Sequence, residues 1–451
     1  HKHLFNDFYK VFDNDISKLP DIGPALIATA AYYFSNSHLQ WNHIGRALCR
    51  VSYFLFKLSL LTSKHRLVEL KLSWDSFFTG VFKFFVINNN SVMTDQVLIL
   101  EAFDVWVTVL SGYFNPKTML EYSLGLLQAC HEKEQNSGMD KRALTVKEEK
   151  FINSKLLLMR RLMNHEFLTK FLFTSGCDEP ERSRFLFKVI EWAVQPFLKH
   201  NGKYLDLTSI RLANGLLVTI IKHSKDVLLQ RNLVRLLPTI CRFFILVRKH
   251  CKENDLFKFR RTFTSLFPIT FPFPEITVDS IVNEEIIIEA LMELATIIAS
   301  ITKIAETRYK DNLSFIYILQ ECAEDEIFDS IFYISQFARE DLLSIIHTVK
   351  LIIKGKFFPS KKWLALNALL IRSSMTLLAL CKDLIIKYKV PEECSGIEDF
   401  DIKLWFEYFK TILLLANHRI SNPNSLSDIP RKAVYKISGD LRETAAGIVE
   451  E

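Results

Sequence analysis

Residues 404–449 read LWFEYFKTILLLANHRISNPNSLSDIPRKAVYKISGDLRETAAGIV, and their pattern decides the fold class. Apolar residues recur three or four positions apart at the start of this stretch, as they do along one face of a helix. A polar loop around Pro423 ends the first predicted helix, and a second run with the same spacing follows. The stretch therefore predicts two helices joined by a loop. The first apolar face holds Trp405, Phe409, Ile412 and Leu415, and the second holds Val434, Ile437, Leu441, Ala445 and Ile448.

The same alternation of an apolar helical face and a polar break recurs through the rest of the 451 residues. Apolar residues make up 49% of the chain, which excludes wholesale disorder. The 13 glycines and 13 prolines are too few for the many turns of an all-β fold. No repeat of fixed length recurs. The sequence therefore predicts an all-α fold, an irregular armadillo- or HEAT-like α-solenoid of stacked helix pairs.

Two stretches interrupt the predicted helical repeats. Residues 132–148, EKEQNSGMDKRALTVKE, are the most polar part of the chain, and we expect them to form an exposed loop. Residues 257–279 contain Pro268, Pro272 and Pro274, which prevent a regular helix, so we expect an irregular Pro- and Phe-rich crossing segment. The repeats then occupy residues 1–131, 149–256 and 280–451, and the last of these ends in the two helices quoted above.

Three local signals predict details within the repeats. Asn115 and Pro116 form a helix start, because asparagine caps a helix and proline suits its first position. Pro238 should kink a helix over residues 226–251. The helix predicted over 280–306 is apolar on all sides but one, so it should lie between two layers. Its polar side carries glutamates four residues apart, which we expect to face solvent: Glu285, Glu289 and Glu293.

Charge and cysteine content limit the classes of partner. The net charge of +6 is small for 451 residues, so we expect no nucleic-acid partner. The eight cysteines are scattered without a C-x-x-C pair, as in cytosolic proteins with reduced thiols. Residues 22–34 are apolar but too short to cross a membrane, and there is no signal-peptide pattern. The chain has no initiating methionine, so we expect a piece of a longer cytoplasmic protein.

No motif for catalysis is present in the sequence. The patterns G-x-G-x-x-G, G-x-x-x-x-G-K-[ST], H-E-x-x-H and G-x-S-x-G do not occur. We therefore expect no catalytic residue, metal site or cofactor. One run interleaves aromatic and basic residues. We interpret it first as a connecting segment whose phenylalanines dock on the helices, and the alternatives are a partner-binding edge and a contact with an anionic membrane surface or with nucleic-acid bases. That run is Phe257, Lys258, Phe259, Arg260 and Arg261.

Residues 404–449 resemble a signature of the DOCK family of atypical Rho-type guanine nucleotide exchange factors, and residues 431–442, RKAVYKISGDLR, carry its most specific part. In that family, a helix and a polar loop precede a run that ends in Gly-Asp-Leu/Met-Arg. The matching residues here are Gly439, Asp440, Leu441 and Arg442. Ser438 departs from the pattern, because animal members usually have tyrosine there. The Asn- and Ile-rich composition is typical of a fungal member. Gly439 should lie inside the last helix at a close helix–helix approach, and Asp440 and Arg442 should pair with neighbouring helices.

The resemblance implies a place in a larger protein. In the family, armadillo-like helices lie between a lipid-binding C2-like domain and a catalytic exchange region, and this chain would be that middle section. It implies an ELMO-type adaptor as partner, a Rac-like GTPase bound through other domains, a possible homodimer of the parent and peripheral recruitment to membranes. The exchange reaction would lie outside the chain, so no catalytic residue is carried over. The alternatives are an unrelated α-solenoid adaptor in transport or vesicle traffic and an enzyme with an unrecognised site.

Overall fold

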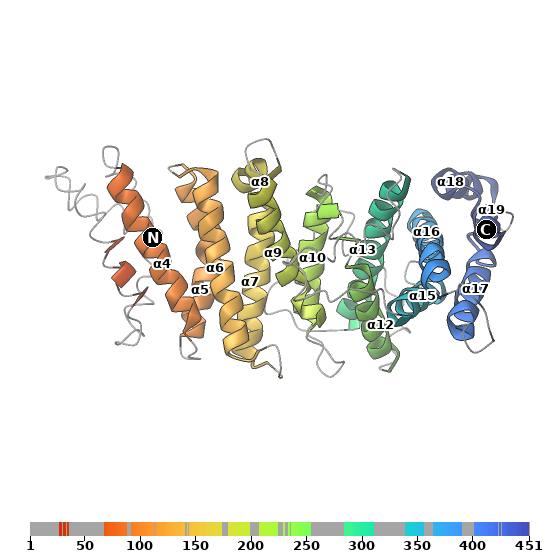
Figure 1. The fold of residues 1–451 in the computed structure, drawn as a ribbon, viewed down its shortest axis with the longest axis horizontal. Helices are drawn as coiled ribbons and strands as arrows, with labels where there is room; N and C mark the ends of the chain where they lie inside the picture. The colour runs from red at the N-terminus through yellow and green to blue at the C-terminus, as the bar shows by residue number, and fades with distance from the viewer. Residues whose placement is uncertain are drawn as a thin grey trace. The chain divides into compact units, whose positions relative to one another are not determined.

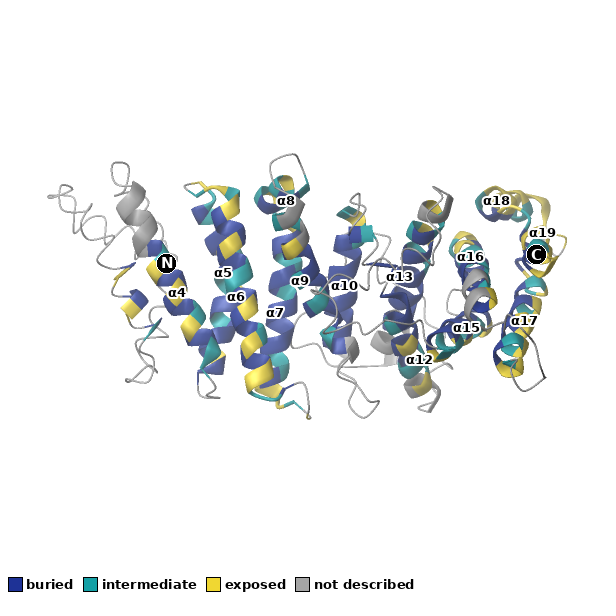
Figure 2. Ribbon diagram, in the orientation of Figure 1, coloured by how far each residue is buried: buried dark blue, intermediate teal, exposed yellow. Residues whose placement is uncertain are grey.

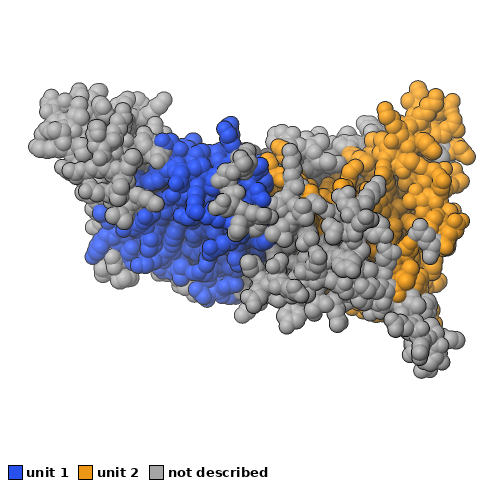
Figure 3. Space-filling model, turned by 45° about the horizontal axis from the view of Figure 1, so that its top comes forward, with its two compact units in different colours: residues 1–193 blue, residues 194–451 orange. Residues whose placement is uncertain are grey.

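A computed structural model describes residues 27–35, 67–87, 92–173, 179–198, 207–223, 229–253, 284–310, 339–355, 364–389 and 401–450, with short gaps inside some ranges. Every regular element within these ranges is a helix, which confirms the all-α prediction (Figure 1). The chain divides into two compact units, residues 1–193 and 194–451 (Figure 3). The division falls inside helix α9 (Glu179–Leu198), and not at the polar stretch 132–148.

Unit 1 stacks its helices in two layers. Helix α4 (Leu67–Val86) packs on α6 (Pro116–Asn136), which packs in turn on α8 (Glu166–Phe173). Helix α5 (Met93–Leu110) packs on α7 (Val146–Asn164) in the other layer. Helices α4, α5 and α6 thus each contact the next helix but one in sequence, as expected for stacked helix pairs.

Aromatic side chains fill the core of unit 1. Trp74, Trp106 and Trp192 are buried, as their positions in apolar helical runs predict. The ring of Phe78 stacks on that of Tyr122, with 4.0 Å between centroids, and so joins α4 to α6. Trp405 in unit 2 is only half-buried, and Trp41 and Trp363 lie outside the described residues.

Unit 2 has the same two-layer arrangement. One layer runs through α10 (Leu207–His223), α13 (Glu284–Lys310), α16 (Leu364–Lys389) and α18 (Asp428–Ser438). The other runs through α12 (Leu237–Glu253), α15 (Arg339–Lys354), α17 (Ile402–Ala416) and α19 (Leu441–Glu450). Contacts of α12 with α13 and of α15 with α16 join the two layers. Both units are therefore irregular α-solenoid segments.

Helix α13 does not lie between two layers as predicted. It belongs to one layer, where it packs on α10 and α16, and it contacts α12 of the other layer. Its polar side does not face solvent throughout. Glu293 is only 1% exposed. Its carboxylate accepts hydrogen bonds from the Arg211 guanidinium at 2.8 Å and from the Asn214 amide at 3.1 Å, both on α10. The prediction of a solvated stripe is therefore wrong for Glu293, because α10 covers this side of the helix. The side chains of Glu285 and Glu289 lie outside the described ones.

Helix α6 confirms the predicted helix start and shortens the predicted loop. The Asn115 side chain accepts a hydrogen bond from the Thr118 backbone nitrogen at 2.8 Å, and Pro116 is the first helical residue. At its other end α6 continues to Asn136, so only residues 137–145 connect it to α7. The last turn stays helical because its polar residues are partly buried. Lys133 donates to the Ile87 carbonyl at 2.8 Å, and Glu134 accepts from Lys155 at 3.0 Å.

The effect of Pro238 differs from the prediction. Helix α12 begins at Leu237, so Pro238 occupies its first turn and does not kink a longer helix. Proline lacks only an N–H that has no partner in the first turn, so it is tolerated there.

One described helix is long and apolar enough to cross a membrane by composition, residues 364–382 of α16. Half of this segment is buried in the protein, where α16 packs on α13, α15, α17 and α18. Core helices of soluble proteins pass the same test, so the finding does not establish a membrane span.

Candidate interaction surface

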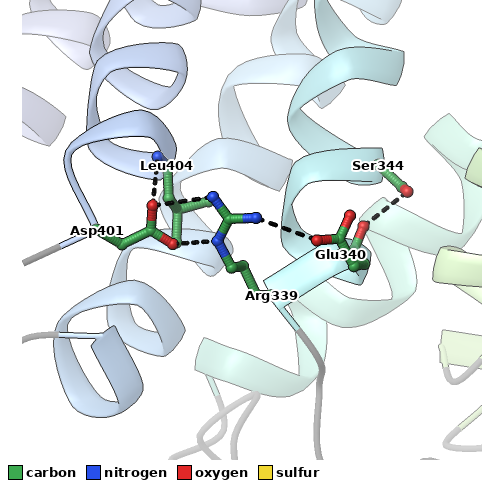
Figure 4. Close-up of polar contacts among 5 residues, drawn as sticks. All are labelled: Arg339, Glu340, Ser344, Asp401 and Leu404. Atoms are coloured by element: carbon green, nitrogen blue, oxygen red, sulfur yellow. Dashed lines mark hydrogen bonds and ion pairs between the residues drawn. The ribbon is translucent and has the colours of Figure 1, made fainter.

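Hydrogen bonds between Arg339 and Asp401 hold the start of α17 on α15, and we call these two residues the polar clamp (Figure 4). The Arg339 guanidinium at the first residue of α15 donates two hydrogen bonds to the Asp401 carboxylate, one of them at 3.1 Å. Asp401 is also the N-cap of α17, because its Oδ1 accepts from the Leu404 backbone nitrogen at 3.1 Å. Arg339 donates to the Glu340 carboxylate as well. One carboxylate therefore begins α17 and fixes its position on α15.

Two further hydrogen bonds hold the inner side of α17. Lys350 of α15 donates to the Glu407 carboxylate at 2.6 Å, and this contact lowers the pKa of Glu407 below its usual value. The buried Tyr408 hydroxyl donates to the Leu378 carbonyl of α16 at 3.0 Å. Helix α17 thus has a defined inward side. Its buried residues are Leu404, Tyr408, Thr411, Ile412 and Leu415.

The opposite side of α17 is apolar and exposed (Figure 2). Ile402, Phe406, Phe409 and Leu413 are 55%, 59%, 39% and 59% exposed, and we call them the outer stripe. They succeed one another at intervals of four, three and four residues, so they form one line along the helix. At about 100° per residue, this line lies about half a turn from the buried side. Phe406, Phe409 and Leu413 also line a shallow groove with Lys410, Leu414 and Asn417.

This arrangement corrects the predicted face of the helix. Trp405 and Phe409 were expected to face the core with Ile412 and Leu415, which are buried. Trp405 is half-buried, Phe409 is exposed, and their rings stack on each other with 5.5 Å between centroids. The reason is that α17 carries two apolar lines. Leu404 and Tyr408 complete the inner line, and the spacing of apolar residues does not show which line faces the core.

Gly439 of the signature does not lie inside a helix. Helix α18 ends at Ser438, and Gly439 follows with a φ of 66° and a ψ of −158°. A Cβ at this position would have no atom within 4 Å, so there is no close helix–helix approach. The predicted position of Gly439 inside a helix and the predicted close helix–helix approach are therefore both wrong. Glycine suits the position because this backbone conformation is open almost only to glycine.

Asp440 and Leu441 begin the next helix. The Asp440 carboxylate accepts from the backbone nitrogens of Arg442 at 2.9 Å and Glu443 at 3.2 Å, as an N-cap does. Asp440 thus finds its partners locally and not on a neighbouring helix, as we had expected. Leu441 is buried, and Arg442 is exposed. The Gly-Asp-Leu sequence is therefore a helix–break–helix that redirects the chain so that α19 packs on α16 and α17.

Helix α18 carries the second exposed face of this region. Arg431, Lys432, Tyr435 and Lys436 line a shallow depression on it, and Ile429 near its start is also exposed. Arg372 of α16 donates to the Ile437 carbonyl at 2.9 Å and fixes the end of this helix. The predicted partner-binding edge, residues 257–261, lies outside the described residues.

Buried charges in both units were not predicted, and those among the described residues have partners within the fold. Beside the Arg211–Glu293 pair of unit 2, unit 1 buries the Lys155–Glu134 pair, and burial lowers the pKa of Lys133 to about 8. Burial raises the pKa of the Cys241 thiol to about 12, so this thiol is unreactive. Among the described residues, no three His, Cys, Asp or Glu side chains gather as metal ligands would.

Comparison with known proteins gives one curated relative. The chain is 38% identical over all 451 residues to DOCK-like protein 1 of Saccharomyces cerevisiae. The chain spans 23% of that protein's length. No family model matches the chain, and no solved structure matches it. The resemblance first seen in residues 404–449 is thus confirmed over the whole chain.

Proposed function

Since this chain belongs to the DOCK-like proteins and corresponds to one section of them, we propose that it is a non-catalytic helical scaffold. In this proposal it connects a lipid-binding C2-like domain to the exchange domain of a guanine nucleotide exchange factor for a Rac-like small GTPase. It also offers protein-binding surfaces, with an ELMO-type adaptor as partner. The observation that carries the proposal is the 38% identity over the full chain to a DOCK-like protein about four times as long.

The contacts of unit 2 support a mechanical role. The Arg339–Asp401 and Lys350–Glu407 pairs and the Tyr408–Leu378 hydrogen bond hold α15, α16 and α17 in one arrangement. Polar side chains that an active site would use serve here as caps and ion pairs. A stack held in this way transmits position from one end to the other, as a spacer between two domains must.

The proposal extends to the setting of the parent protein. We expect a cytoplasmic protein that is recruited to membranes through its other domains, acts on a protein partner and not on nucleic acid, and forms a homodimer. Membrane recruitment and the homodimer follow from the family resemblance. The small net charge is the reason to expect no nucleic-acid partner, and the scattered cysteines are the reason to expect a cytoplasmic protein.

The role of the section is tested by nucleotide exchange on a Rac-like GTPase, measured by release of a fluorescent nucleotide. The full-length protein should accelerate release, and the 451-residue chain alone should not. Release by the chain alone would contradict the non-catalytic role. No release by the full-length protein on any Rac-like GTPase would contradict the exchange function itself.

Adaptor binding is tested by capture of a purified ELMO-type protein on the immobilised chain. Replacing Arg260 and Arg261 by glutamate should reduce capture if residues 257–261 form the partner-binding edge. The matched control replaces Lys432 and Lys436 of α18, which reverses the same amount of charge elsewhere. Equal loss in both variants would indicate a general charge effect, and no capture by the unchanged chain would remove the adaptor from the proposal.

A further inference from the structure

We propose that the outer stripe of α17 is the docking site for an amphipathic helix of a partner protein, and that this helix carries acidic residues along one flank. The stripe consists of Ile402, Phe406, Phe409 and Leu413. The inference stands on the geometry and charge of α17 and does not depend on the proposed function.

The spacing of the stripe is that of a helix–helix seam. Intervals of four, three and four residues keep a line of apolar side chains facing a partner helix that lies alongside. Isolated exposed apolar residues are common on protein surfaces, but a continuous line of large ones marks an interaction site. The shallow groove beside Phe406, Phe409 and Leu413 provides room for a partner side chain.

The described helices of unit 2 do not occupy this stripe. Within its layer α17 packs between α15 and α19, and α16 lies against it from the other layer. The stripe faces away from the buried side, so a further helix stacked in the same layer would not cover it. An occupant must therefore approach the layer from outside.

The charges beside the stripe indicate the chemistry of the occupant. Lys403 and Lys410 are seven residues apart and thus lie on the same flank of the stripe. Neither lysine forms an ion pair with a described residue, and the Lys410 amine lies 5.0 Å from the centre of the Phe406 ring. The single acidic residue of α17, Glu407, is engaged by Lys350. The flank is therefore cationic, and an acidic helix complements it.

A second copy of the chain fits this site less well. In an antiparallel pairing of two α17 helices, equivalent flanks face each other, so Lys403 and Lys410 would meet the same lysines. In a parallel pairing the lysines would face the opposite flank, that of Trp405 and Ile412, which has no charge. A partner helix with acidic residues on one flank is attracted to Lys403 and Lys410. Pairing of two α17 helices instead brings these lysines together or places them against an uncharged flank.

The test uses the 451-residue chain and two synthetic helical peptides of about 21 residues, or three heptads. Both peptides carry leucines at alternating intervals of three and four, one with glutamates on its flanks and the other with lysines. Binding is measured by fluorescence anisotropy. We expect the glutamate peptide to bind and the lysine peptide to bind at least about fivefold more weakly.

Two variants of exposed residues locate the site. Phe406→Glu with Leu413→Glu should weaken binding of the glutamate peptide at least about tenfold. Lys403→Glu with Lys410→Glu should exchange the preference, so that the lysine peptide binds more tightly. Two matched controls on α18 should leave peptide binding unchanged. One is the single variant Ile429→Glu, and the other is the double variant Lys432→Glu, Lys436→Glu. Circular dichroism and the thermal midpoint of each variant confirm that it is folded.

Three results would overturn the proposal. The first is equal binding of both peptides to the unchanged chain, and the second is full binding by the folded Phe406→Glu, Leu413→Glu variant. The third comes from sedimentation analysis of the chain without peptide. If the unchanged chain self-associates, the Phe406→Glu, Leu413→Glu variant does not, and neither peptide binds, the occupant of the stripe is a second copy of the chain.

Discussion

Helices α13 and α17 both consist mainly of apolar residues, but α13 buries a charged residue whereas α17 exposes large apolar residues. Helix α13 buries a glutamate, Glu293, against Arg211 and Asn214. Helix α17 exposes four large apolar residues and keeps its only glutamate on an ion pair with Lys350. The difference lies in their neighbours. Helix α13 packs on α10, α12 and α16, whereas no described helix covers the outer side of α17. Surrounding helices, and not helix composition, decide which side is buried.

The largest effect that would test this comparison is expected at Glu293. Glu293→Leu removes the carboxylate that faces the buried Arg211 guanidinium, which should destabilise unit 2 by about 3–5 kcal/mol. Combining it with Arg211→Met removes both charges and should recover most of that loss. Urea unfolding measured for both variants checks this. Equal stability of the single and double variants would show that the pair does not act as a unit.

The next largest effect is expected where the chain turns between α18 and α19. Gly439→Ala forces a side chain onto a backbone with a φ of 66° and should cost about 1–3 kcal/mol, although there is space for the methyl group. Gly447→Ala is the matched control, because Gly447 lies within α19 with nothing near its Cβ. It should stabilise the helix by about 0.5–1 kcal/mol. Thermal unfolding of both variants should give shifts of opposite sign.

A smaller effect is expected at the clamp that orients α17. Asp401→Asn keeps a good N-cap but loses the charge that pairs with Arg339, so it should cost about 0.5 kcal/mol, since the pair is partly exposed. Asp401→Ala loses the cap as well and should cost about 1–2 kcal/mol. Chemical unfolding measures both values. If the two variants were equally stable, the capping hydrogen bond would contribute nothing.

The Lys350–Glu407 pair should make α17 sensitive to acid. The pKa of Glu407 is lower in the folded chain than in the unfolded chain, because Lys350 donates to its carboxylate. Its contribution is therefore complete above the unfolded pKa and is lost as the pH falls through the lower, folded pKa. Stability measured from pH 7 downward should fall less steeply in Glu407→Gln than in the unchanged chain. If stability fell equally steeply with pH in both proteins, the Lys350–Glu407 pair would not contribute to the acid sensitivity.

The smallest effect on stability is expected at the outer stripe. Phe406→Ser and Leu413→Ser should each change the free energy of unfolding by less than about 0.5 kcal/mol, because both side chains are already in water. Ile412→Ser on the buried side of the same helix should cost several times more. The ratio of these losses measures how different the two sides of α17 are. Similar losses on both sides would mean that the stripe is packed and not open.

Patterns local in sequence predicted much of the helical architecture. Asn115 and Pro116 begin α6 as predicted, because caps and prolines act within one turn. The Gly-Asp-Leu run was singled out as part of a family signature, and its backbone conformation was not foreseen. A glycine between two helical patterns is equally compatible with a continuous helix and with a break, and local spacing does not separate them.

The family, the all-α class and the start of α6 thus follow from the order of residues, since periodicity, caps and a short signature are local properties. The partner of Glu293 and the exposure of Phe406 depend on helices far away in the sequence. Arg211 and Glu293 are 82 residues apart, and only the packing of α10 on α13 brings them together. The burial of a side chain depends on which residues lie next to it in space. When a helix has two apolar sides, its sequence does not show which side the neighbouring helices will cover.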